Sequence, residues 1–155
     1  MQAIFDAWLK ITRRLDCMGD FLPQLGLRLF LAYEFWESGM IKLNGANWFA
    51  DIQSDFPFPF NIIPPEISWQ IATWFELIGP AALILGLATR FFSLSLIILT
   101  IVAWASVHAG NGYNFSNNGY KLVLIYLIMI TPLFFNGAGK ASIDYLLSKR
   151  YLSAA

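Results

Sequence analysis

The chain has 155 residues, and its ten basic and ten acidic side chains give a formal net charge of zero. Only 13% of the residues are charged, about half the share of an ordinary soluble domain, and 57% are hydrophobic. This composition excludes a disordered tail and a nucleic-acid binder with a basic surface. One cysteine, Cys17, and one histidine, His108, exclude an internal disulfide, a Cys-x-x-Cys couple and a typical zinc site. The sequence therefore predicts a small integral membrane protein without a metal centre.

Residues 1–20 are expected to form an amphipathic helix. Apolar residues recur there at helical spacing, at Ile4, Trp8, Ile11, Leu15 and Met18. Charged residues interrupt the segment, so it lacks the apolar core of a signal peptide. We expect this helix to lie on the membrane surface, with its basic residues toward the lipid headgroups.

Four apolar runs follow, at about 21–43, 67–88, 91–109 and 120–135. A membrane span needs about 20 apolar residues. The fourth run is shorter, and Pro132 is expected to weaken its end. The alternative is a soluble four-helix bundle, but residues 94–102 and 122–130 offer almost no polar stripe. The predicted fold is all-α: a four-span bundle over 21–136, followed by a cytoplasmic segment over 137–155 that contains a short helix.

Basic residues predict the orientation. Those outside the runs lie before the first, between the second and third, or after the fourth: Lys10, Arg13, Arg14, Arg90, Lys140, Lys149 and Arg150. The other connections, 44–66 and 110–119, contain neither Lys nor Arg. By the positive-inside rule, both termini are expected in the cytoplasm of a bacterium, with the protein in its inner membrane.

The 44–66 connection combines five aromatic residues with four prolines. Its Phe-Pro-Phe-Pro-Phe run, residues 56–60, favours extended backbone. We expect a lid packed on the outer mouth of the bundle. The alternative is an aromatic anchor at the level of the lipid headgroups.

Ionisable residues within the runs should face the bundle interior. Arg28, Phe35 and Lys42 share one face of the first run with Gly39, and Glu34 and Glu37 flank that face. Glu76 in the second run should point inward and contact Arg28 or the Glu37–Lys42 region. Glu76 then either belongs to a structural ion pair or, together with its own backbone carbonyl, accepts a proton or cation.

Small residues and a proline mark the packing of the second run. Ala72, Gly79 and Gly86 form a stripe at seven-residue spacing, which is expected to admit a neighbouring helix closely. Pro80 has no amide hydrogen, so it should free the Glu76 carbonyl and kink the helix. Gly39, Gly79, Pro80 and Gly86 are therefore predicted to be structural residues.

Polar residues of the outer half are candidates for one outward-facing pocket. They are Glu37, Lys42, His108, Asn111, Tyr113 and Lys121, with Arg28, Glu34 and Glu76 as further candidates deeper in the bundle. A histidine at a membrane edge is more often a hydrogen-bonded interfacial residue than a ligand. A copper site of His108 with Met40 is the alternative that its chemistry leaves open.

These features together resemble the DoxX family of small four-span bacterial inner-membrane proteins. The resemblance covers about residues 25–147 and rests on an ordered set of motifs: Leu27-Arg28-Leu29, Phe35, Gly39 with Lys42, Glu76-Leu77-x-Gly79, Gly86, Arg90, His108 and Gly137-x-Gly139-x-x-Ser142-Ile143-Asp144. Trp48-Phe49 followed by Phe56-Pro57-Phe58-Pro59 resembles the HvfX type, which is encoded beside copper-binding modified peptides. Tyr33, Glu34 and Ala109-Gly110 depart from the usual family pattern.

The resemblance implies three alternatives for function. The first is an accessory protein, without catalysis of its own, that supports the maturation or export of a copper-binding modified peptide with other membrane proteins. The second is a subunit of a quinone-linked oxidoreductase, of the thiosulfate:quinone type or in an oxidative-stress complex, with quinone held near Glu76, His108 and Tyr113. The third is a small transporter subunit, for which the dissimilar halves of the chain offer little support.

Overall fold

The computed structural model describes residues 1–152, and all of its regular elements are helical. The main helices are α1 (Gln2–Gly19), α2 (Leu22–Asn44), α4 (Pro65–Leu85), α5 (Thr89–Ala103), α6 (Lys121–Asn136) and α7 (Ile143–Leu152). Short elements fill the two connections at the opposite end: α3 (Phe49–Ile52), η1 (Gln53–Asp55), η2 (Phe60–Ile62), η3 (Trp104–His108) and η4 (Ala109–Asn111). The four predicted apolar runs thus coincide with α2, α4, α5 and α6 to within a few residues, α5 continuing through η3.

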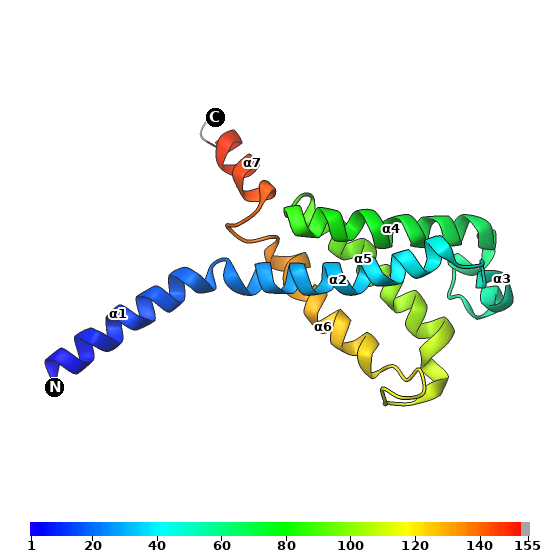
Figure 1. Ribbon diagram of the computed structural model, residues 1–155, viewed down its shortest axis with the longest axis horizontal. Helices are drawn as coiled ribbons and strands as arrows, with labels where there is room; N and C mark the ends of the chain where they lie inside the picture. The colour runs from blue at the N-terminus through cyan, green and yellow to red at the C-terminus, as the bar shows by residue number, and fades with distance from the viewer. Residues whose placement is uncertain (153–155) are drawn as a thin grey trace.

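Helices α2, α4, α5 and α6 pack side by side as an antiparallel bundle (Figure 1). Helix α2 packs mainly on α4, and α5 packs on both α4 and α6. Leu31, Leu83, Leu96, Ile130 and Leu133 fill the centre and are inaccessible to solvent. Both chain ends, with α1 and α7, lie at one end of this bundle, and α3 lies at the other.

Local chemistry explains where α4 begins and ends. Pro65 begins the helix, where its missing amide hydrogen costs nothing. Gly86 ends it with a left-handed φ of 64°, and the Leu87 amide donates to the Ala82 carbonyl at 2.9 Å. The helix passes through Pro80 without a break, and α6 likewise passes through Pro132. The predicted break at Pro132 is therefore absent, and α4 stays continuous at Pro80, where a kink is predicted.

The distribution of polar and apolar side chains differs from that of a soluble bundle. Polar side chains are buried in the bundle interior, among them Arg28, Thr73, Glu76, Ser93 and Thr100. Large apolar side chains form exposed stripes at helical spacing, such as Ile67, Ile71, Trp74 and Ile78 on α4 and Phe91, Leu94, Ile98 and Ile101 on α5. Such stripes indicate a surface whose solvent is itself apolar.

The test for membrane spans by length and composition is met by one helical segment of the described chain, Thr89–Asn111, with 23 residues. Helix α6 is apolar but shorter, at 16 residues. The other long helices do not meet this criterion. The number of membrane crossings therefore remains a prediction from the sequence.

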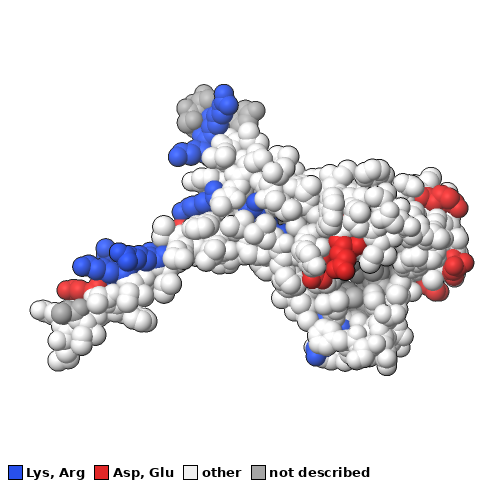
Figure 2. All heavy atoms as spheres, in the orientation of Figure 1, with Lys and Arg blue, Asp and Glu red and all other residues white. Residues whose placement is uncertain are grey.

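Charge is separated along the bundle. Figure 2 shows most of the basic side chains over α1 and near the chain ends, and acidic side chains mainly at the opposite end and on the bundle face between the two ends. Helix α1 projects from the bundle with its apolar residues exposed, including Ile4, Trp8 and Leu15. At its base, the exposed Lys140 donates a hydrogen bond to Asp20, and this bond raises the pKa of Lys140.

Candidate functional site

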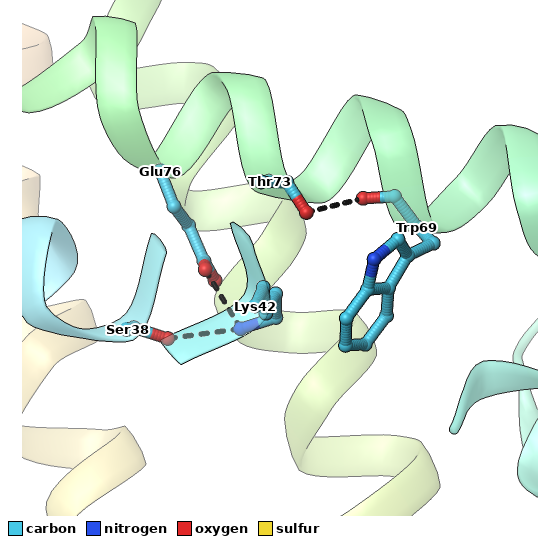
Figure 3. A network of polar contacts seen from close by, with 5 residues as sticks. All are labelled: Ser38, Lys42, Trp69, Thr73 and Glu76. Carbon is cyan, nitrogen blue, oxygen red and sulfur yellow. Dashed lines mark hydrogen bonds and ion pairs between the residues drawn. The ribbon is translucent and has the colours of Figure 1, made fainter. Parts of the chain in front are cut away.

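A buried ion pair joins α2 to α4. Lys42 Nζ lies 2.7 Å from Glu76 Oε2, and the two side chains are only 13% and 9% exposed. Lys42 also donates to Ser38 Oγ at 2.9 Å, one turn earlier on its own helix (Figure 3). The expected contact between Glu76 and the first apolar run is therefore present, and its partner is Lys42 rather than Arg28.

Close backbone packing holds this pair in place. A methyl group added to Gly39 would lie 2.8 Å from the Glu76 carbonyl oxygen and 2.9 Å from Leu77 Cδ2. Real side chains essentially never approach backbone that closely, so only glycine fits at this point. Because Pro80 offers no amide hydrogen to the Glu76 carbonyl, that oxygen faces Gly39 without its helical partner. We call this close contact between α2 and α4 the seam. It lies at Gly39 and Glu76, at the same level of the bundle as the ion pair.

Gly79 does not belong to this seam, contrary to the predicted stripe. A methyl group there would meet Phe92 and Leu96 of α5 at 3.6–3.7 Å, an ordinary van der Waals contact.

Gly39→Ala should therefore lower the melting temperature of the purified protein strongly, while Gly79→Ala should leave it nearly unchanged. Thermal unfolding in detergent measures both. Equal effects of the two substitutions would contradict the assigned seam.

A polar chamber of about 370 Å³ opens beside the ion pair, between α2, α5, α6 and the 112–120 connection. Glu34, Lys42, Glu76 and His108 line it, so four of the candidate residues do share one cavity. Tyr126 donates a short hydrogen bond to Glu34 across the chamber wall. The chamber can therefore offer carboxylate, ammonium, phenol and imidazole groups to one small ligand.

His108 is oriented by the backbone. Its Nδ1 lies 2.6 Å from the carbonyl oxygen of Asn118. A carbonyl only accepts, so Nδ1 carries the hydrogen and Nε2 of the neutral ring is left as an acceptor. The residue ends the π-helical turn η3, an element that often occurs at functional sites.

The remaining pocket candidates lie outside this chamber. Glu37 and Tyr113 are exposed, and Asn111 donates to the Val107 carbonyl at 3.0 Å. Lys121 Nζ lies over the rings of Tyr113 and Phe115, 5.2 and 4.5 Å from their centroids. The prediction of a single pocket for all of these residues is wrong. Asn111, Tyr113 and Lys121 instead form contacts that stabilise the 112–120 connection. Met40, the second ligand of the copper alternative, does not line the chamber.

Arg28 lies at the opposite end of the bundle from the polar chamber. Its prediction as a pocket residue is therefore also wrong. Its guanidinium donates to four backbone carbonyls: Leu83 at 2.6 Å, Ile84 at 2.7 Å, Ala141 at 2.7 Å and Ala138 at 3.0 Å. Gly86 packs against it, since a methyl group there would lie 2.7 Å from Arg28 Nη2 and 2.4 Å from Ser142 Cβ. Arg28 thus ties the chain after α6 to the end of α4.

Asp144 completes this inner junction. Its two carboxylate oxygens accept from the amides of Ala88 and Thr89, at 2.7 and 2.9 Å, and so cap the start of α5. Ser142 Oγ accepts from the Tyr145 amide at 3.2 Å and caps α7. The Ser142-Ile143-Asp144 motif therefore has a structural role in closing the bundle.

Sequence reasoning missed Tyr126 and the contribution of Trp69 of α4 to the aromatic roof of the site. Tyr126 is the sole polar side chain in the apolar stretch 122–130, and that isolation was a usable signal. The roof is formed by Trp48, Phe49, Phe56 and Trp69, whose rings meet edge to face at 4.9–6.0 Å. The 44–66 connection is therefore packed on α4, as expected for a lid, although Phe58 is 80% exposed. Its prolines give short turns rather than continuous extended backbone.

The fold and site define an all-helical protein with apolar outer faces and buried polar groups. The sequence model of the DoxX family matches residues 24–109. The chain is also 54% identical, over 140 residues, to an uncharacterized protein of Haemophilus influenzae. The aligned region covers 88% of this chain and 93% of that relative. The chain belongs to the DoxX family, whose members are generally membrane-associated. No solved structure matches it significantly.

Proposed function

We propose that this protein is a four-span accessory component of the bacterial inner membrane that supports maturation or export of a copper-binding modified peptide. The polar chamber beneath the 44–66 lid carries the proposal, because it offers a ligand-sized space at the end of the bundle away from both termini. The resemblance of residues 48–59 to the HvfX type supports the kind of partner. With one cysteine and one histidine, the residue content of the chain fits an accessory role better than autonomous redox catalysis.

Several features of the structure support the membrane arrangement. Apolar stripes cover the outer faces of the bundle, and basic residues gather at the end that holds both termini (Figure 2). Exposed apolar residues of α1 would be covered if that helix lay in the inner lipid surface.

Cysteine labelling tests the topology in cells. Cys17 is exposed and should resist a membrane-impermeant maleimide, because we place it in the cytoplasm. Ser54→Cys or Ser116→Cys, each combined with Cys17→Ser, should label rapidly from outside, because both serines lie in the outer connections. Labelling of Cys17 before the outer positions would contradict the arrangement.

Gene deletion tests the role. In a strain that makes the modified peptide, loss of this gene should reduce the amount or the modification of the peptide outside the cell, as measured by mass spectrometry. Wild type and Glu66→Gln should restore it, whereas Glu76→Gln should restore it poorly. Glu66 is the matched control because it is exposed in the first turn of the same helix. An unchanged peptide in the deletion strain would reject the proposal.

The chamber also favours a second candidate, a quinone-linked oxidoreductase subunit. His108, Glu34 and Tyr126 could bind the oxygens of a quinone headgroup, and a partner subunit would supply the electrons. Tyr113 is no part of this version, since it lies outside the chamber. Purified protein should then carry quinone, and Tyr126→Phe should lose it. Neighbouring genes discriminate the candidates: a Cys-rich peptide with its modifying enzymes favours the first, and sulfur-oxidation genes favour the second.

A further inference from the structure

A second cavity lies directly under the aromatic lid, next to the polar chamber. Its volume is about 120 Å³, and it is enclosed by α3, α4, α5 and the 56–63 segment. The two cavities adjoin, and their common wall includes Lys42 and Glu76 together with Trp48, Leu99, Ala103 and Val107. The lid residues Trp48, Phe49 and Phe56 close the outer side. We call this space the apolar chamber.

One face of α4 sets the polarity of the apolar chamber. Ser68, Ala72 and Glu76 follow at four-residue spacing and all line it. Glu76 is neutralised by Lys42 at 2.7 Å, so the inner end presents an ion pair with no net charge. At the outer end, Ser68 Oγ is buried and has no hydrogen-bond partner among the described residues. A buried hydroxyl without a partner is costly, and a ligand that bonds it would remove that cost.

The size and walls of the chamber restrict the ligand. A cavity of about 150 Å³ lined by aliphatic and aromatic residues binds benzene in another protein, so this one suits a single six-membered ring. The edges of Trp48, Phe49 and Phe56 offer favourable contacts to such a ring. Because the chamber carries no net charge, a neutral ligand is favoured over an ion.

The chamber can be reached from the side of the bundle. Ile71 of α4 and Ile98 of α5 both line it, yet they are 45% and 40% exposed on the outer surface. In the membrane arrangement proposed above, that surface faces lipid. A ligand dissolved in the bilayer would therefore meet the wall of the chamber at these two side chains without crossing water.

We propose that the apolar chamber is a binding site for a neutral, lipid-soluble molecule that carries one six-membered ring and one hydroxyl group, which bonds Ser68 Oγ. This site adjoins the polar chamber but has its own polar group, Ser68, and it does not depend on the role of the protein in peptide maturation or quinone binding.

The test uses 4-bromophenol and bromobenzene with the full-length protein in detergent. Bromine quenches tryptophan fluorescence on contact, and Trp48 lines the chamber. Both compounds should quench saturably. Ser68→Ala should weaken 4-bromophenol about tenfold, the value of one hydrogen bond to a buried group, and leave bromobenzene unchanged.

Two neighbouring residues of α5 provide a matched pair. Val102 lines the chamber, so Val102→Phe should abolish saturable quenching by both compounds. Ile101 is 45% exposed and does not line it, so Ile101→Phe should quench like the wild type. Non-saturable quenching of the wild type, or equal binding by Val102→Phe in a folded state, would overturn the proposal. The selective effect of Ser68→Ala tests it independently if Val102→Phe does not fold.

Discussion

Glu76→Leu is expected to destabilise the protein by about 3–5 kcal/mol, because it leaves the Lys42 ammonium buried without a counter-charge. Lys42→Met should cost a similar amount, since it leaves the Glu76 carboxylate unpaired beneath the lid. Either change should appear as a large fall in melting temperature in detergent. Glu76→Gln keeps the side-chain shape and should fall between Glu76→Leu and the wild type.

The double variant distinguishes the stability contribution of the Lys42–Glu76 interaction from the cost of burying each charge. Replacing a buried ion pair by apolar residues of similar size is often neutral or stabilising, because both desolvation costs disappear together. Lys42→Met with Glu76→Leu should therefore recover most of the stability lost by either single variant. Glu66→Leu, at an exposed position of α4, is the control and should change the melting temperature little. A double variant as unstable as the sum of the two singles would show that the side chains act independently.

Recovery of stability in that variant would also inform the function. A pair retained only for packing could be replaced by leucine and methionine without loss of the peptide phenotype. The shared position of Lys42 and Glu76 in the walls of both cavities predicts the opposite. The double variant should therefore be stable and yet fail to restore the modified peptide.

The helices and the ion pair could be predicted because they follow from local pattern. Long apolar runs identify four helices, and an acidic residue in such a run must face inward toward a base. Lys42 and Arg28 were equally suitable partners by this reasoning. The choice depends on depth along two adjacent helices, and the Gly39–Glu76 contact sets that depth in three dimensions.

The glycines show a related limit. Seven-residue spacing places Gly79 on a defined face of α4, but α4 has neighbours on two sides. Its contacts with Phe92 and Leu96 show that Gly79 packs on α5 rather than α2. Which face meets which helix depends on the order of helices around the bundle, and the sequence of α4 alone does not contain that order.

The polar chamber was predicted only in part, because some of its lining comes from irregular structure. His108 is turned by η3, and Asn118, which accepts its hydrogen bond, has a left-handed φ of 53°. No periodic sequence pattern predicts the π-helical turn or the left-handed backbone of Asn118. Asn111, Tyr113 and Lys121 were assigned to the same pocket because the predicted topology places them in the outer half of the bundle, although contacts within 107–121 hold them elsewhere.

Arg28→Met should be the second strongly destabilising substitution. The guanidinium supplies donors to the end of α4 and to the 138–141 segment at once, and each buried carbonyl left without a donor costs about 1–3 kcal/mol. Lysine should not rescue it, because a single ammonium cannot reproduce the planar fork that reaches both segments. We expect a lower melting temperature and faster proteolysis after residue 136 for both variants.

Arg90→Met is the matched control for that experiment. Arg90 lies at the same end of the bundle but is exposed, with a single hydrogen bond of 3.2 Å to the Phe135 carbonyl. Its loss should leave both measurements close to those of the wild type. If Arg90→Met and Arg28→Met loosened the segment equally, net positive charge at this end would be responsible. The expected difference arises because only Arg28 is buried among backbone acceptors, and that burial makes one side chain the link between the first helix of the bundle and the chain that follows its last.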